Sequence, residues 1–458
     1  MKNSRKYTVK ILDLSSQGEG VARPEDLPVF FVPGALPGEK VEVRPTTKKK
    51  NYWRTELLSV REASGHRVNP RCDVYESCGG CNLQHLDYKV QLKEKEKIIK
   101  DSLSRIGGVE ELPEFSVTGM DFPWYYRNKG QFPVGREDVK KGEEGGRTRA
   151  GLYKKGSHEL VFFDECSIQH QPINRLLKET EKKLHRYEIT PYNEEQDSGN
   201  LRHLVIRGAV CSSQLQLTFV TRSGKLPARK EITSELMEEI RSLWSIYHSV
   251  NAKDTNVILG DEIELVAGER FITEYIRDKK FYIHPSSFFQ VNTQQTEKLY
   301  ERVLSLARDV SPRRIIDAYC GAGTIGIYLA DGMKGDIEKT VGIEEVPQAV
   351  QAAAVNSSLN ECRNIDFIQG KVEKVLPGLD LEEELVIVDP PRRGLSENSC
   401  QTILDSSPSA VVYVSCNPGT LARDISRLST SFRLEKIEAV DMFPHTHHVE
   451  TAALLVRN

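Results

Sequence analysis

Residues 314–326 read Arg-Ile-Ile-Asp-Ala-Tyr-Cys-Gly-Ala-Gly-Thr-Ile-Gly, and this stretch decides the expected fold. It begins as an apolar strand and continues into a turn with the glycine spacing GxGxxG. Glycines at these positions let backbone N–H groups approach a ligand at the N-terminus of the helix that follows. The stretch therefore predicts the first strand, the ligand-binding turn and the first helix of an α/β fold.

Apolar runs after this stretch predict the other strands of the same sheet. They lie at 340–344, 365–367, 385–389 and 410–415, and they are rich in Val, Ile and Leu. Nearly continuous apolar strands are typical of a parallel sheet that helices cover on both faces. We therefore expect residues 285–458 to form a Rossmann-like α/β domain.

Short alternating segments predict a smaller unit at the N-terminus, over residues 1–63. Runs at 7–12, 27–32, 40–44 and 52–60 are separated by turns rich in glycine and proline. Several short strands in so few residues favour a small OB-like barrel. The basic and aromatic turn from Lys48 to Arg54 suits a phosphate backbone and stacked bases, and it fits a solvated hairpin tip equally well.

Residues 64–284 form a central part that is expected to be mainly β. Alternating strands are expected near 160–163, 204–206, 215–221 and 263–266. The pattern also predicts a helix over 231–244. A long charged helix over 88–107 precedes these elements and carries an apolar stripe.

The composition of the 458-residue chain fits a globular protein of several domains. Apolar residues are 38% and charged residues 28%, no run approaches a membrane span, and the N-terminus lacks an apolar signal-peptide core. We therefore expect a cytoplasmic protein with no membrane association. The net charge of −3 hides an asymmetry, because residues 1–61 hold 12 Lys and Arg against 7 Asp and Glu, whereas residues 285–458 hold 17 against 24. This asymmetry suggests a basic partner-binding arm, although charge alone favours an ordinary solvated surface.

Nine cysteines are informative in a cytoplasmic protein, because structural disulfides are rare there. Cys72, Cys78 and Cys81 lie close together in the sequence, and Gly79-Gly80 separates the last two. Three thiolates at this spacing favour a metal ion or an iron–sulfur cluster, which takes four protein ligands. Cys166 is the best candidate for a distant fourth ligand, and zinc is the alternative to iron.

The ligand at the glycine turn is indicated by two acidic residues. Glu344 closes the next strand, where an acidic side chain takes ribose hydroxyls, and GxGxxG alone would also fit NAD. Asp317, however, precedes the glycines and would repel a pyrophosphate. The spacing Asp317-x-x-Cys-Gly-x-Gly resembles the first motif of S-adenosylmethionine-dependent methyltransferases. We therefore expect S-adenosyl-L-methionine to contact Gly321, Gly323 and Thr324.

Two further motifs follow strand ends, where open α/β sheets bind their ligands. Asp389 begins the rigid loop Asp-Pro-Pro-Arg, and its carboxylate could accept the N3–H of a uracil. Cys416 lies before Asn417-Pro418, which turns the chain toward the ligand crevice. Enzymes that methylate amino groups use a related Pro-Pro loop, but that chemistry would leave Cys416 without a role.

The thiol at Cys416 points to chemistry at C5 of uracil, which is a poor nucleophile by itself. A thiolate that adds to C6 builds enolate character at C5, so that C5 can take up a methyl group. A base must then remove the proton from C5. Glu450, at the end of the segment His445-Thr-His447-His448-Val-Glu450, is the expected base. A metal site at the histidines is the alternative for that segment.

Together these motifs resemble the RNA uracil-C5 methyltransferase family over nearly the whole chain. The resemblance implies a class I methyltransferase domain, an N-terminal TRAM domain and a mainly β central domain with a [4Fe-4S] cluster. It implies cluster ligands at Cys72, Cys78, Cys81 and Cys166, cofactor contacts at Gln290, Tyr319, Glu344 and Asp389, the nucleophile at Cys416 and the proton acceptor at Glu450. It also implies that the helix over 88–107 packs on the catalytic domain.

The TRAM domain and the cluster together resemble the ribosomal branch of the family, so 23S rRNA is the expected partner. The transfer-RNA branch usually lacks both features. The alternatives are the same chemistry on tRNA, an amino-group methyltransferase, and a non-catalytic iron–sulfur protein that binds RNA. No obligate protein partner is expected, and Lys371 leaves the adenine contact unassigned, because a polar or acidic residue is common at that place.

Overall fold

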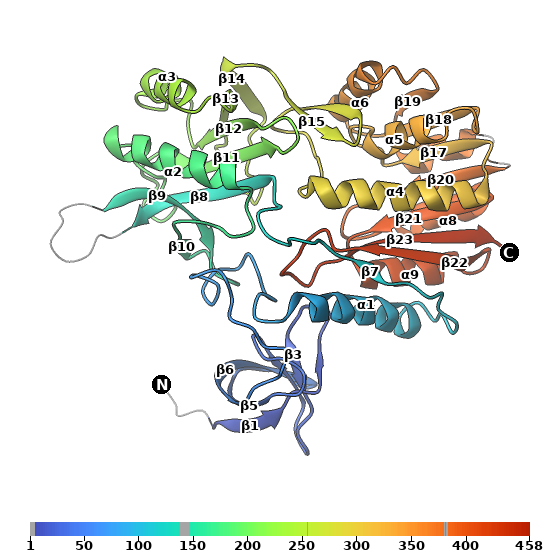
Figure 1. Cartoon of the computed structure of the whole chain (residues 1–458), viewed down its shortest axis with the longest axis horizontal. Coiled ribbons are helices and arrows are strands. Elements are labelled where there is room, and N and C mark those ends of the chain that lie inside the picture. Colours follow the sequence, from blue (N-terminus) through green and yellow to red (C-terminus); the bar gives the residue numbers. More distant parts are fainter. Residues whose placement is uncertain (1–4, 138–145, 254, 380, 382) are drawn as a thin grey trace.

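The computed structural model describes residues 5–137, 146–253, 255–379, 381 and 383–458. Figure 1 shows three large sheets that follow one another along the chain, from the N-terminal barrel through a central sheet to a C-terminal α/β sheet. Within these described ranges, no helix is both long and apolar enough to cross a membrane.

The N-terminal sheet has the strand order β1-β5-β6-β4-β3-β2. Its strands are β1 Tyr7–Lys10, β2 Asp13–Leu14, β3 Gly20–Ala22, β4 Val29–Val32, β5 Lys40–Lys48 and β6 Tyr52–Glu62. Alternation along the strands turns Phe30, Val41 and Val43 into a shared core, where each is fully buried. The basic turn that begins at Lys48 is the tip of the hairpin between β5 and β6, where Lys49 and Lys50 are exposed.

Helix α1, Tyr88–Arg105, lies between the barrel and the C-terminal sheet in Figure 1. Its first turn is capped by Asp87, whose side chain accepts backbone N–H groups of the helix. Ile99 and Leu103 are fully buried in a core that they share with helix α9, Pro418–Leu428. This helix therefore packs on the C-terminal domain, although the central sheet follows it in the sequence.

The central sheet has the strand order β10-β9-β8-β11-β12-β13-β14. Its elements are β8 Lys129–Glu137, β9 Arg147–Tyr153, β10 Leu160–Phe162, α2 Gln171–Arg186, β11 Leu201–Ala209, β12 Gln214–Thr221, α3 Arg229–Glu239, β13 Leu243–Val250 and β14 Glu262–Gly268. One face is apolar and packs against α2 and α3 through residues such as Leu176, Leu236 and Phe219.

One expected element of the central part is wrong in its extent. The helix expected over 231–244 ends at Glu239, and Leu243 already begins strand β13. Strand β13 pairs in parallel with β12 and antiparallel with β14. Hydrogen bonds to a strand on each side stabilise β13 more than an extra turn of helix α3 would. Tertiary context therefore overrides the local helix pattern.

The C-terminal sheet has the strand order β19-β18-β17-β20-β21-β23-β22-β7. Its elements are β7 Val117–Thr118, α4 Thr293–Val310, β17 Arg314–Ala318, α5 Thr324–Gly332, β18 Lys339–Glu344, α6 Pro347–Leu359, β19 Ile365–Gln369, α7 Val372–Val375, β20 Glu384–Val388, α8 Glu397–Ser406, β21 Ala410–Ser415, β22 Phe432–Val440 and β23 Glu450–Arg457. The first five strands in the order are parallel, and β23 lies antiparallel to β21. The strand order reverses between β17 and β20, and ligands bind at the carboxyl ends of strands at such a point.

Two segments from earlier in the chain complete this domain. Strand β7 pairs in parallel with the edge strand β22. The hairpin of β15, Ile272–Ile276, and β16, Lys279–Ile283, places Phe281 in the same core as α4. The C-terminal core therefore extends across the expected division at residue 284.

Candidate active site

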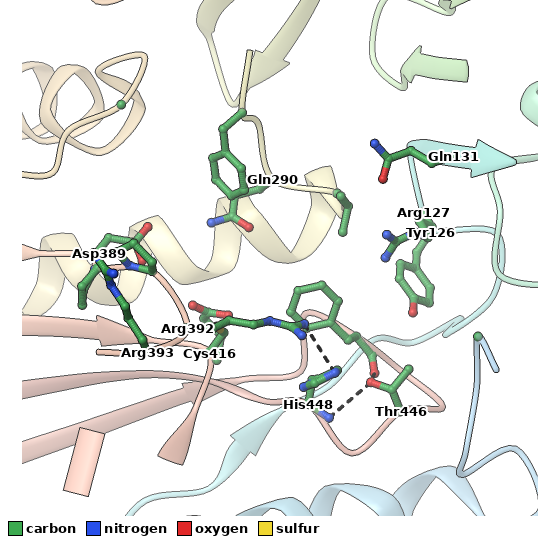
Figure 2. Close-up of a pocket in the computed structure, with 18 of the residues that line it drawn as sticks. Tyr126, Arg127, Gln131, Gln290, Asp389, Arg392, Arg393, Cys416, Thr446 and His448 are labelled. Atoms are coloured by element: carbon green, nitrogen blue, oxygen red, sulfur yellow. Dashed lines mark hydrogen bonds between the residues drawn. The ribbon is translucent and has the colours of Figure 1, made fainter. Parts of the chain in front are cut away.

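A cavity of about 950 Å³ opens at the carboxyl ends of β17, β20 and β21. Its lining includes most of the residues singled out in the sequence: Cys72, Cys78, Cys81, Cys166, Gln290, Tyr319, Gly321, Glu344, Asp389, Cys416 and Glu450. The central domain supplies Tyr126, Arg127 and Gln131 on the opposite wall, as Figure 2 shows. The cavity therefore lies between the two domains.

The glycine-rich turn is held in an unusual backbone conformation. Tyr319, Gly321 and Gly323 all have positive φ, at 69°, 54° and 77°. A Cβ on Gly323 would lie 3.0 Å from side-chain atoms of Ala353 and Phe367, so both space and backbone conformation require glycine there. The strained Tyr319 brings its side chain to the cavity wall, where its hydroxyl donates to Ser399 Oγ at 3.2 Å.

Two carboxylates fix this turn from behind. Asp317 Oδ2 accepts the backbone N–H of Gly326 at 2.8 Å, and burial raises the pKa of Asp317 to about 7. Glu344 accepts the N–H of Gly321 at 3.1 Å and that of Val346 at 2.8 Å. The Glu344 carboxylate is thereby oriented at the cavity wall, where it can receive ribose hydroxyls.

Two of the expected cofactor contacts lie away from the cavity. Thr324 Oγ1 bonds the hydroxyl of Tyr300 at 2.7 Å, and neither Thr324 nor Gly323 is among the residues that line the cavity. Gln290 does line it, and the backbone oxygen of Gln290 accepts Asn128 Nδ2 at 3.0 Å. The Gln290 side chain points into the open space in Figure 2.

Cys416 follows β21 and precedes the capped end of α9. Asn417 is the N-cap residue, and its side chain accepts the N–H of Gly419 at 3.1 Å. This cap fixes the turn on which the thiol stands. Burial raises the pKa of Cys416 to about 11, Glu450 adds to this rise, and the guanidinium of Arg392 opposes it.

Asp389 and Glu450 form a pair of carboxyl groups that share the cavity with the thiol. Glu450 is only 3% exposed, and burial together with the charge of Asp389 raises the pKa of Glu450 well above its usual value. Burial also raises the pKa of Asp389 to about 7. Such a carboxyl group takes up a proton readily, as a general base requires.

Arg392 links these groups, and sequence reasoning gave it no role. Its guanidinium extends past Cys416 toward His448, where Arg392 Nη2 lies 3.4 Å from His448 Nε2 (Figure 2). The backbone oxygen of Arg392 accepts Asn417 Nδ2 at 3.3 Å, which ties the Asp-Pro-Pro-Arg loop to the cysteine loop. Arg392 and Cys416 belong to separate motifs of the sequence, and only the folded loops bring the two together.

The four cysteines singled out as metal ligands reach one wall of the cavity. Cys72, Cys78 and Cys81 come from the loop before α1, and Cys166 comes from the loop before α2. All four are free thiols. Within the described part of the chain, no three His, Cys, Asp or Glu side chains are grouped as a site for a metal ion.

Comparison with known proteins decides the family. The family model described as tRNA (Uracil-5-)-methyltransferase matches residues 229–458, and the TRAM domain model matches residues 2–58. The chain belongs to the RNA uracil-C5 methyltransferase family. This membership confirms the expected class I fold, the N-terminal TRAM domain and S-adenosylmethionine-dependent methylation of uracil C5 in RNA.

Whole-length relatives support the same assignment. An uncharacterized RNA methyltransferase of Bacillus cereus is 40% identical over 447 residues, covering 97% of this chain and 95% of the relative. One from Listeria monocytogenes is 38% identical over 463 residues, covering 100% of this chain and 99% of the relative. The crystal structure of Pyrococcus abyssi tRNA (uracil-54, C5)-methyltransferase with S-adenosyl-L-homocysteine is 31% identical, with a TM-score of 0.77, and covers 98% of this chain and 100% of that one.

Proposed function

We propose that this enzyme methylates C5 of a uracil in 23S rRNA, with Cys416 as nucleophile and Glu450 as proton acceptor. The observation that carries the proposal is the presence of Cys416, Arg392 and Glu450 in one cavity beside the glycine-rich turn. A cytoplasmic location belongs to the same proposal, because its RNA substrate is there.

The reaction begins at the thiol. Cys416 loses its proton, and the thiolate forms a bond to C6 of the uracil, which moves the electrons of the C5–C6 double bond toward C5 and O4. The Arg392 guanidinium stabilises the thiolate by its charge, since it lowers the pKa of Cys416 against the effects of burial and Glu450. Arg392 therefore offsets part of the rise in the pKa of Cys416 that burial and Glu450 cause.

The reaction ends at the buried carboxylate. Glu450 takes the proton from C5, the electrons of that C–H bond restore the C5–C6 double bond, and the Cys416 thiolate leaves C6. Burial and the nearby Asp389 make Glu450 a stronger base than an exposed glutamate. Because burial and Asp389 raise the pKa of Glu450, the fraction of Glu450 in the deprotonated form that acts as a base increases as the pH rises.

The residues of the turn fit S-adenosyl-L-methionine. Bound there, it supplies a methyl group on a sulfonium, which the activated C5 can accept. Glu344 would receive the ribose hydroxyls, and Gln290 and Tyr319 would contact the cofactor from the cavity wall. Asp389 and Glu344 put negative charge on this wall, as a cationic cofactor requires.

The four cysteines fit a [4Fe-4S] cluster better than a zinc ion. A single zinc ion would draw its four sulfurs to within roughly 4 Å of one another, since each Zn–S bond is about 2.3 Å. The four thiols line a common wall, and four thiolates are the number that a [4Fe-4S] cluster takes. The cluster would join the loop before α1 to the loop before α2 as a structural cross-link.

Ribosomal RNA and transfer RNA are the two candidate substrates. The TRAM domain together with the cysteine set supports 23S rRNA. The similarity to the Pyrococcus abyssi tRNA (uracil-54, C5)-methyltransferase supports transfer RNA, because it extends over 98% of this chain. Domain layout alone therefore does not separate the two substrates, and both must be offered in the test.

The experiment uses unmodified 23S rRNA and tRNA from a strain that lacks the gene, with labelled cofactor and nucleoside analysis. We expect 5-methyluridine in 23S rRNA and none with Cys416→Ala. Glu450→Gln should accumulate a covalent protein–RNA adduct, because addition proceeds while elimination stops. Methylation of tRNA alone would refute the ribosomal substrate, and normal turnover by Cys416→Ala would refute the thiol mechanism.

The metal is tested on anaerobically purified protein. We expect a brown protein with about four irons, as a [4Fe-4S] cluster requires, and loss of its absorption in Cys166→Ser. Cys211→Ser is the matched control, because Cys211 is exposed in the turn after β11 and does not line the cavity. A colourless protein with one zinc would overturn the cluster.

A further inference from the structure

Two cations face each other on neighbouring strands of the central sheet. Lys129 at the start of β8 pairs directly with Arg207 on β11, so their side chains emerge on the same face. Like charges placed directly opposite each other across two strands destabilise a sheet. Burial and the charges of Arg207 and Arg127 lower the pKa of Lys129 to about 7. Folding therefore tolerates an unfavourable pair at this position.

Within the part of the chain that the structure describes, neither cation has a partner of opposite charge. No carboxylate there lies within ion-pair distance of Lys129 or Arg207 or acts on the pKa of either group, and the Lys129 side chain makes no hydrogen bond to a described residue. Arg207 is 3% exposed, and its Nε and Nη1 atoms are buried without a hydrogen-bond partner. Among the described residues, its one side-chain hydrogen bond runs from Nη2 to the backbone oxygen of Ser287 at 3.1 Å. A buried cation without a partner is costly and calls for an anion from outside the chain.

This pair continues the wall of the active-site cavity. Gln131, two residues along β8 and therefore on the same face as Lys129, lines the cavity. Arg127 lines it too, and its Nε donates to the backbone oxygen of Lys129 at 3.1 Å. Figure 2 shows Arg127 and Gln131 across the open space from Gln290.

Arg127 lies on the cavity wall opposite the carboxylates, and the pair of Lys129 and Arg207 lies next to Arg127 in the central domain. Asp389, Glu344 and Glu450 belong to the C-terminal domain, whereas Arg127, Lys129 and Arg207 belong to the central domain. The acidic wall suits a cationic cofactor, and the cationic wall suits an anion. An RNA whose target base leaves the stack must present its backbone phosphates beside the cavity that receives the base.

We propose that Lys129 and Arg207 form a binding site for a backbone phosphate of the substrate RNA, next to the nucleotide whose uracil enters the cavity. Lys129, which is only half-buried, contacts the phosphate, and Arg207 raises the positive potential from behind it. The site rests on the proposed function, since it specifies how the RNA is held for methylation.

The proposal predicts opposite effects of substitutions at Lys129 and Arg207 on RNA affinity and on thermal stability. Replacing either cation by a neutral residue of similar length relieves the repulsion, so the protein should unfold at the same or a higher temperature. The same change removes a phosphate contact, so RNA binding should weaken. A residue with a purely structural role would move both properties in the same direction.

The test uses full-length protein and a labelled oligouridylate of about 12 nucleotides, with affinity measured from about 50 to about 200 mM salt. Lys129→Gln and Arg207→Met should each bind roughly tenfold more weakly at low salt. In Lys129→Gln the slope of log affinity against log salt should fall by about 0.7, the value for one phosphate on a single strand. Methylation of 23S rRNA should show a raised KM with nearly unchanged kcat.

Lys178→Gln is the matched control, because Lys178 is exposed on α2, which covers the other face of the same sheet. It should change neither affinity nor slope. Unchanged affinity in Lys129→Gln and Arg207→Met would overturn the site. Weaker binding by Lys129→Gln with an unchanged salt slope would also overturn it. So would weaker binding accompanied by a lower unfolding temperature in both variants. The wild-type protein separates the two hypotheses, since failure of wild-type methylation refutes the proposed function whereas these variants refute only the phosphate site.

Discussion

At the scale of single residues, the active site depends on one cation among three acidic groups. Cys416, Glu450 and Asp389 each have a raised pKa because the cavity wall shields them from water. Arg392 is the group that opposes this effect for both Cys416 and Glu450. In the proposed mechanism, the chemistry therefore depends on a residue that has no reacting atom of its own.

The first prediction concerns pH. The working forms of Cys416 and Glu450 are deprotonated and both pKa values are raised, so single-turnover methylation should increase from pH 7 to pH 9 and fall toward acid. Arg392→Gln should shift this profile to higher pH and lower the rate at pH 7 by roughly ten- to a hundredfold, the effect of one to two pKa units. Arg393→Gln, the neighbouring cavity-lining arginine, should leave the midpoint unchanged. An unshifted profile in Arg392→Gln would refute this role.

The residues with reactive atoms could be proposed from the sequence, whereas the neighbouring groups that shift their pKa values could not. A cysteine before Asn-Pro and a glutamate at the start of the final strand are visible as motifs, because their chemistry is local in the sequence. The contact of Arg392 with His448 depends on two loops that are 56 residues apart. The cofactor contact expected at Thr324 stays a prediction, because the motif does not show where the side chain points, and the Thr324 hydroxyl bonds that of Tyr300 in the fold.

At the scale of elements, helix α1 and Asn82 hold residues 441–447, the segment that precedes β23; we call these contacts the clamp. Lys95 Nζ pairs with Asp441 Oδ1 at 2.5 Å, and both side chains are fully buried. Gln91 accepts the N–H of His445 at 3.0 Å, and Asn82, just before the helix, accepts the N–H of His447 at 3.0 Å. These bonds hold the segment that leads to the proposed base, Glu450.

The second prediction tests this clamp. Lys95→Met should lower the free energy of unfolding by about 3 to 5 kcal/mol, because it leaves Asp441 buried without its cation. Lys93→Met, two residues earlier and exposed, should change it by less than about 0.5 kcal/mol. Urea unfolding monitored by circular dichroism gives both values, and equal stability of the two variants would contradict the clamp.

Long elements with a regular apolar pattern could be predicted from the sequence, whereas very short ones could not. The parallel strands were visible as apolar runs, and β21 spans residues 410–415 as expected. Strand β7 has only two residues and pairs with β22, far away in the sequence. No periodicity can mark so short a strand, because its existence depends on the partner.

At the scale of the whole molecule, the basic tip of the barrel is the exposed turn between β5 and β6, which begins at Lys48. Lys49 and Lys50 are exposed, and Lys48 Nζ lies 4.3 Å from the ring centroid of Trp53. The tip is suited to hold RNA at a distance from the cavity without touching the reacting base.

The third prediction follows from this separation. The double variant Lys49→Gln/Lys50→Gln should raise the KM for RNA several-fold and reduce its salt dependence, while kcat with saturating RNA and cofactor binding stay unchanged. Lys10→Gln is the control, because Lys10 is exposed on the same barrel and pairs with Lys40 at the other end of β5. Steady-state methylation at several salt concentrations gives the answer, and a fall in kcat alone would count against a binding role.

The pairing of β7 with β22, and of α1 with α9, has a consequence for biosynthesis. The ribosome releases β7 and α1 long before it makes the elements they join, since β22 begins only at Phe432. Until then the nascent chain carries the apolar side of α1 uncovered while the central sheet can already form. Translation must almost finish before the catalytic sheet can gain its last edge, so a stalled or truncated chain cannot produce a partly active enzyme.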